Sequence, residues 1–93
     1  HLNTWEERLK EYGLLEVPAR ELLKKLSENK LGERRSTLLA FLNIKIKNDE
    51  KAEATLNKLL YMLQNDGYLI EEELKYAFRS PLLRDFWFTR FSK

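Results

Sequence analysis

The chain has 93 residues, a length that suits one domain with a single core. Its 43% apolar and 34% charged content is that of an ordinary globular protein. It contains no cysteine, which excludes disulfides and cysteine-based zinc sites, and no apolar run reaches the length of a membrane span. We therefore expect a cytoplasmic protein that does not enter a membrane.

The first 16 residues indicate a short helix and a connector. Either Asn3 or Thr4, each with a glutamate three residues later, fits the capping box that begins a helix. Gly13 is expected to end this helix, because glycine accepts the left-handed conformation found after a helix. We expect residues 1–16 to be a connecting segment and residues 17–93 to be the domain proper.

Three amphipathic patterns then predict helices over 18–29, 33–44 and 50–65. Pro18 fits the first position of the first helix. The second pattern is apolar over most of its girth, which predicts a central helix. Residues 44–47 alternate apolar and basic side chains, so this stretch is consistent with either helix or strand. Asn48 is a good N-cap for the third helix of the set. Apolar stripes of the outer two helices should form the core; they are Ala19, Leu22, Leu23 and Leu26, and Ala52, Leu56, Leu59, Leu60 and Leu63.

A hairpin is predicted over 68–79. Gly67 ends the preceding helix, and two β-favouring segments follow it on either side of Glu71–Glu73. We expect the three glutamates to form the turn, with Glu71 across from Lys75. Three consecutive strand carboxylates point to alternate faces, so they do not suit a metal site.

A last helix should begin at Ser80-Pro81, an N-cap followed by proline at the first helical position. Placed at 100° per residue, one half of this helix is apolar and should pack inward; it contains Leu82, Leu83, Phe86, Trp87 and Phe91. Phe88 lies outside that half, next to Arg84 and Asp85. It is either part of a second buried face or an exposed contact residue.

The predicted fold class is mainly α with a small β-hairpin: about five helices and a two-stranded wing, in the order of a winged helix-turn-helix. The segments GYL and YAFRSPLLRDFW also resemble the C-terminal winged-helix domain of archaeal-type ATP-binding proteins of the AAA superfamily in prokaryotes. The resemblance covers about the last quarter of the chain. The residues that carry it are Gly67, Tyr68, Leu69, Tyr76, Phe78, Pro81, Leu82, Leu83, Arg84, Phe86 and Trp87.

The resemblance implies an accessory domain, with ATP and Mg²⁺ bound elsewhere in the parent protein. This chain has no GxxxxGK[ST] motif, so no cofactor is expected to bind to it. The implied partner is the ATPase domain of the same protein or of a neighbouring subunit. Arg84, Phe88 and Phe91 are the candidate contact residues, since aromatic and arginine side chains dominate protein-protein hot spots. A stand-alone homodimer is a third interpretation.

Nucleic-acid binding is the alternative function. In a helix-turn-helix the second helix enters the major groove. Here that is the helix 50–65, whose first turns carry Asp49, Glu50 and Glu53, and acids repel phosphates. Residues 24–47 are the better candidate, because seven of them are basic and two acidic. The candidate contacts in this block are Lys24, Lys25, Arg34, Arg35, Lys45 and Lys47.

No catalytic constellation is apparent. There is no cysteine and a single histidine, at position 1, and none of the serines lies in a G-x-S-x-G context. We therefore expect this chain not to be an enzyme in itself.

Overall fold

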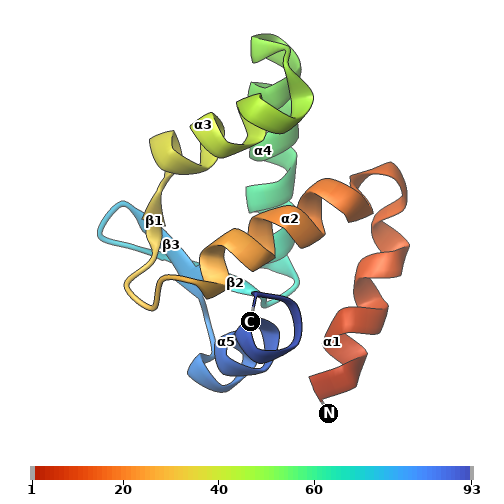
Figure 1. Ribbon diagram of the computed structural model, residues 1–93, viewed down its shortest axis with the longest axis vertical. Coiled ribbons are helices and arrows are strands. Elements are labelled where there is room, and N and C mark those ends of the chain that lie inside the picture. The colour runs from red at the N-terminus through yellow and green to blue at the C-terminus, as the bar shows by residue number, and fades with distance from the viewer. Residues whose placement is uncertain (1, 93) are drawn as a thin grey trace.

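The computed structural model describes residues 2–92 and shows a mainly helical protein with a small antiparallel sheet (Figure 1). The sheet lies to one side of the helices, with the tip of its hairpin projecting outward (Figure 1). The elements in chain order are α1 (Leu2–Arg8), the 3-10 segment η1 (Leu9–Leu15), α2 (Glu16–Ser27), β1 (Glu33–Arg34), α3 (Arg35–Ile46), α4 (Asp49–Asn65), β2 (Leu69–Glu72), β3 (Lys75–Phe78), α5 (Pro81–Trp87) and the π-helical turn η2 (Phe88–Ser92). Within residues 2–92 no helix combines the length and apolarity needed to cross a bilayer.

The N-terminal segment packs on the rest of the molecule. Leu9 is completely buried, and the Trp5 ring meets Tyr68 edge-on with 4.9 Å between centroids. The Tyr68 hydroxyl donates a hydrogen bond to the Trp5 carbonyl at 2.6 Å, and that of Tyr12 donates to Asp66 Oδ2 at 2.8 Å. These contacts join α1 and η1 to the start of the hairpin, about 60 residues away in sequence. α1 begins at Leu2, before both predicted caps, so the predicted start was late.

The core lies between α2 and α4, as the two apolar stripes predicted. All nine residues of those stripes are buried. The prediction that the intervening helix is central was wrong. Only Leu38 and Leu42 of α3 are buried, and Ile44 is exposed. Leu39, Phe41 and Ile46 are partly buried and pack against the edge of the core, so α3 covers the core from one side although the helix is apolar nearly all round.

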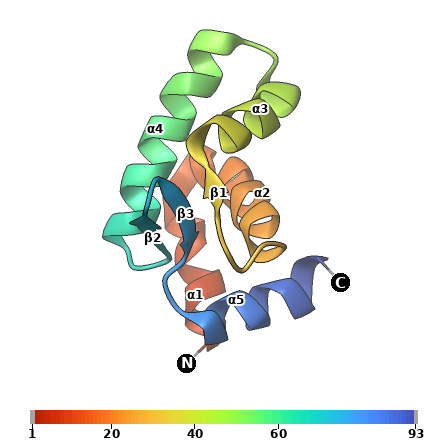
Figure 2. The ribbon, with the colours of Figure 1, turned by 90° about the vertical axis from the view of Figure 1, so that its left-hand side faces the viewer.

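The stretch 44–47, for which the sequence allowed either helix or strand, is mainly helical. α3 continues to Ile46, and Lys47 adopts a left-handed conformation with φ 61°. Asn48 then caps α4, because its Oδ1 accepts a hydrogen bond from the Lys51 amide at 2.9 Å. The two helices cross at a wide angle in both ribbon views (Figures 1 and 2).

The sheet has three strands in the order β1-β3-β2, all antiparallel. The predicted hairpin is present, but the sequence analysis missed β1, which is only two residues long. The register also differs from the prediction. Glu72, and not Glu71, lies across from Lys75, because β2 extends to Glu72 and the turn is formed by Glu73 and Leu74.

Two glycines are required where the backbone turns next to other groups. At Gly32 φ is +87°, and a Cβ there would lie 2.7 Å from the Tyr76 carbonyl oxygen, so only glycine lets the chain enter β1 beside β3. At Gly67 φ is +89° and a Cβ would come within 3.3 Å of the Trp5 ring. The predicted helix end at Gly67 is confirmed.

Candidate protein-contact site

The last helix begins as predicted. Ser80 Oγ accepts a hydrogen bond from the Leu83 amide at 3.1 Å, and Pro81 occupies the first turn, where no amide hydrogen is needed. α5 then widens into the π-helical turn η2, so that the last twelve described residues form one continuous coil. Figure 2 shows this coil crossing the lower end of the molecule, beside α1.

Trp87 attaches the coil to the core. Its side chain is buried and its ring lies 6.2 Å from Tyr68, 6.1 Å from Phe78 and 5.2 Å from Phe91, measured between centroids. At the far end, the hydroxyl of Ser92 donates to the Lys24 carbonyl of α2 at 3.2 Å. The coil is therefore attached to the rest of the domain by Trp87 near its middle and by Ser92 at its end.

Each of the three predicted contact residues has a partner within the chain. Arg84 donates to the Ser27 carbonyl and to Asp85 Oδ1, the latter at 2.6 Å, and its side chain is 13% exposed. Its guanidinium also lies over the Phe88 ring, 5.4 Å from the centroid. Phe88 and Phe91 are both half-buried. Arg84 thus connects α5 to the end of α2, and Phe88 is shielded beneath it.

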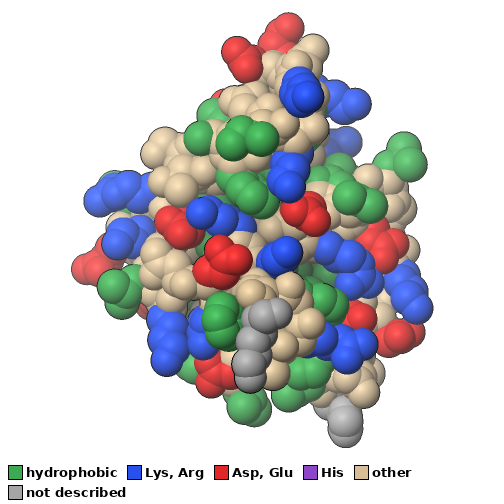
Figure 3. Space-filling view, in the orientation of Figure 1, with side chains coloured by type: hydrophobic (Ala, Val, Ile, Leu, Met, Phe, Trp, Pro, Cys, Tyr) green, Lys and Arg blue, Asp and Glu red, His purple; other side chains and the backbone are tan. Residues whose placement is uncertain are grey.

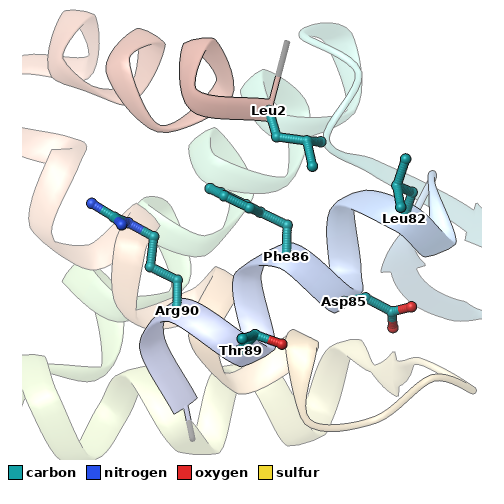
Figure 4. A pocket seen from close by; sticks show the side chains of 6 residues that line it. All are labelled: Leu2, Leu82, Asp85, Phe86, Thr89 and Arg90. Atoms are coloured by element: carbon teal, nitrogen blue, oxygen red, sulfur yellow. The ribbon is translucent and has the colours of Figure 1, made fainter.

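A groove lined largely by apolar side chains lies on the outer side of the coil (Figure 4). It has a volume of about 470 Å³ and is lined by Leu2, Leu82, Asp85, Phe86, Thr89 and Arg90. Leu2 of α1 and Phe86 of α5 point toward each other across it, and Leu82 forms the neighbouring wall. Leu82 is 66% exposed, so the prediction that it packs inward was wrong.

The groove is bounded by charge. Arg90 Nε lies 2.7 Å from Glu6 Oε1, an ion pair that ties η2 to α1 at one end of the groove. Asp85 lies on the opposite rim. Sequence analysis missed this site because one wall comes from α1, which lies about 80 residues earlier in the chain. The one signal in the sequence was the helical spacing of Leu82, Phe86 and Thr89, which places these three residues on the same side of the last helix.

The basic block does not form one continuous patch. Lys25 and Lys45 both lie over the Phe41 ring, with their ammonium nitrogens 6.0 Å and 5.4 Å from its centroid, and Lys24 lines the same hollow. Glu21 lines this hollow too, and its carboxylate lies 3.2 Å from Lys45 Nζ. Basic and acidic side chains are interspersed across this face (Figure 3).

The other three residues of the block lie elsewhere. Arg35 pairs with Glu53 of α4 at 2.8 Å and donates to the Asn57 amide oxygen. Arg34 is exposed on β1, and Lys47 is exposed in the turn before α4. The fold therefore divides the six predicted cations among α2, β1 and both ends of α3.

The outward side of α4 is acidic, as expected. Its first half forms a shallow hollow lined by Asp49, Glu50, Glu53, Ala54 and Asn57. Farther along, Tyr61 is exposed. Arg35 of α3 reaches this hollow but is already paired with Glu53, and the exposed Lys51 and Lys58 are the basic side chains of α4 itself. The acidic residues of the first turns therefore weaken the attraction of this end of the helix for phosphates.

Burial raises the pKa of three tyrosines. Burial, and then the hydrogen bond to Asp66, hold the pKa of Tyr12 far above its ordinary value. Burial raises that of Tyr68 to about 12. Burial, followed by the nearby Glu71 carboxylate, also raises the pKa of Tyr76. All three remain neutral hydrogen-bonding groups near pH 7, which suits structural roles. No set of three potential metal ligands converges among residues 2–92.

Comparison with protein-family models, with curated proteins and with solved structures found no match.

Proposed function

We propose that this chain is a non-catalytic accessory domain of the winged-helix type, which acts by binding another protein. The order α2, β1, α3, α4, β2, β3, with β3 between β1 and β2, supports the winged-helix assignment. The closing segment YAFRSPLLRDFW supports the likeness to accessory domains of ATP-binding proteins. The proposed partner is accordingly the ATPase domain of the same protein or of a neighbouring subunit, and ATP and Mg²⁺ would bind there.

One observation carries the protein-binding proposal: the groove between α1 and the α5-η2 coil. Leu82 and Phe86 offer apolar surface in a cavity of about 470 Å³, with Asp85 and Arg90 at its edges. An apolar centre with a charged rim is the usual composition of a protein interface. Arg84, Phe88 and Phe91 each contact other residues of the domain, so the proposed contact shifts from these predicted residues to the groove.

The test titrates the separately produced ATPase domain into this domain and measures binding by calorimetry. Leu82→Lys should weaken association about tenfold or more, because it places a charge in the apolar centre. Leu14→Lys is the matched control, since Leu14 is fully exposed on η1. Equal affinity for wild type and Leu82→Lys would reject the groove. A full-length protein without a P-loop ATPase domain would reject this partner and leave the groove to be tested with another.

DNA binding remains the alternative proposal. It is favoured by Lys24 and Lys25 on α2, and by the exposed Arg34 beside the wing. A gel-shift titration at low salt tests it, with Arg34→Glu combined with Arg35→Glu as the variant. Micromolar binding that this variant weakens would support DNA as the ligand, whereas no binding at low salt would remove it.

A further inference from the structure

The tip of the wing is strained and exposed. Glu73 and Leu74 form the turn between β2 and β3 with φ of 51° and 68°. A two-residue turn of this kind favours Asn-Gly, because side chains other than those of asparagine and aspartate crowd the left-handed conformation. Leu74 also leaves 69% of its surface in solvent. Strain held in an apolar residue at the tip of a hairpin points to a functional constraint, since neither packing nor turn chemistry requires leucine there.

Acidic side chains outnumber basic ones around this leucine, because three glutamates come directly before it and Lys75 alone comes directly after it. Glu71, Glu72 and Glu73 precede it, and neither Glu72 nor Glu73 forms an ion pair with another residue of the described chain. The tip therefore repels phosphate groups and membranes with anionic lipids. Its complement is a small apolar socket with a basic rim.

The same chain carries such a socket at the other end of the hairpin. A cavity of about 220 Å³ is lined by Lys30, Phe78, Pro81, Arg84 and Asp85. Phe78 and Pro81 supply apolar surface, and Lys30 forms no ion pair with any described residue. Cavities of about 150 Å³ hold a benzene-sized molecule, so this one has room for a leucine side chain.

The tip cannot enter the socket of its own chain. Leu74 precedes the first residue of β3 and Phe78 is the last, so the strand holds them about 13 Å apart. The two ribbon views agree that the wing tip and the start of α5 lie at opposite ends of the hairpin (Figures 1 and 2). A second copy that approaches end to end is not held at this separation, so its tip can reach the socket.

We propose that this domain associates head to tail with further copies of itself, through insertion of Leu74 of one copy into the Lys30-Phe78-Pro81 socket of the next. The glutamates of the tip face the exposed Lys30 at the rim, where Arg84 and Asp85 already neutralise each other. The contact joins two different surfaces, so it is heterologous and each copy keeps one free tip and one free socket. The socket shares only Asp85 with the α1-α5 groove, and the proposal does not depend on the proposed ATPase partner.

Sedimentation velocity over about 10 μM to about 1 mM tests the proposal, because contacts of this small size bind in that range. The mean mass of the wild-type protein should rise with concentration, and added salt should reverse the rise. Leu74→Asn removes the knob with a residue that accepts the left-handed conformation, and Lys30→Glu reverses the socket charge. Each should weaken association about tenfold or more. Leu14→Asn, an equally exposed leucine elsewhere, should behave as wild type.

Mixing the two variants gives the decisive measurement. Lys30→Glu retains an intact tip and Leu74→Asn retains an intact socket, so together they should form a one-to-one complex although each alone is monomeric. Circular dichroism checks that both variants are folded. A wild-type protein that stays monomeric throughout would overturn the proposal. So would self-association that Leu74→Asn leaves unchanged, or a mixture that forms no complex.

Discussion

Replacing Trp87 with alanine should remove a large part of the stability of the domain. The side chain is 1% exposed, and its ring lies next to four other aromatic rings from the hairpin and the closing coil, those of Tyr68, Phe78, Phe86 and Phe91. Truncating a fully buried tryptophan costs about 3–5 kcal/mol, and a domain of this length has about 5–14 kcal/mol in total. We therefore expect the free energy of unfolding to fall by at least about a fifth. The coil would lose its main attachment to the core.

Urea denaturation followed by far-ultraviolet circular dichroism measures the loss. The shift in the midpoint urea concentration, multiplied by the dependence of the unfolding free energy on urea concentration (the m value), gives the change in free energy. Trp5 remains as an independent fluorescent probe of the contact between α1 and the hairpin. Leu82→Ala is the control on the same helix and should change stability by no more than about 0.5 kcal/mol. A loss below about 1 kcal/mol for Trp87→Ala would refute the reasoning, since it would mean that the coil contributes little to the core.

Three further predictions concern the turns and the buried hydroxyls. Gly32→Ala should lower stability by at least about 2 kcal/mol, because its Cβ would meet the Tyr76 carbonyl oxygen at 2.7 Å. Gly13→Ala should lower it by only about 1 kcal/mol, the strain of positive φ, because nothing lies within 4 Å of a Cβ there. Thermal unfolding of both variants checks the difference. Asn48→Ala should cost about 1 kcal/mol in the same assay through loss of the α4 cap, and no change would contradict the observed hydrogen bond. Burial raises the pKa of Tyr68 to about 12 in the folded protein, against 10.0 when unperturbed, so this tyrosine ionises first in the unfolded chain. Through this group the free energy of unfolding should fall as pH rises above about 10, by up to about 1.4 kcal/mol per pH unit. Urea titrations between pH 8 and 11 should show a smaller fall of stability with pH for Tyr68→Phe than for the wild type.

The helices and their buried faces followed from local patterns. The spacing of Leu22, Leu23 and Leu26 on α2, and of Leu56 and Leu59 on α4, predicted their burial correctly. Caps at Asn48 and Ser80 and the stop at Gly67 were also confirmed, since each depends on atoms only a few residues away. Predicted bounds of α2, α3 and α4 differed from the structure by one or two residues.

Contacts between distant segments were not predictable in this way. The strand β1 consists of two charged residues and exists because β3 lies alongside it. The hairpin register depended on the two-residue turn at Glu73 and Leu74, which has no glycine or asparagine to mark it.

The candidate sites also combine features that the sequence predicted with features that only the fold decided. Sequence alone identified the aromatic last helix and an inward face that includes Leu83 and Trp87, both of which are buried. It placed Leu82 inward, because a helical wheel shows which residues share a face but not whether a neighbouring helix covers that face. It grouped six cations by their nearness in sequence, and the fold separated them and paired Arg35 and Lys45 with glutamates.

The amino-acid sequence by itself determined the helices, their apolar stripes and the chemistry of most of their ends, because these depend on interactions over a few residues. Tertiary structure decided which apolar side chains remained exposed, which charges were neutralised, and where a groove and a socket formed. Those features require atoms from segments that meet only when the chain is folded: Leu2 beside Phe86, and Lys30 beside Pro81.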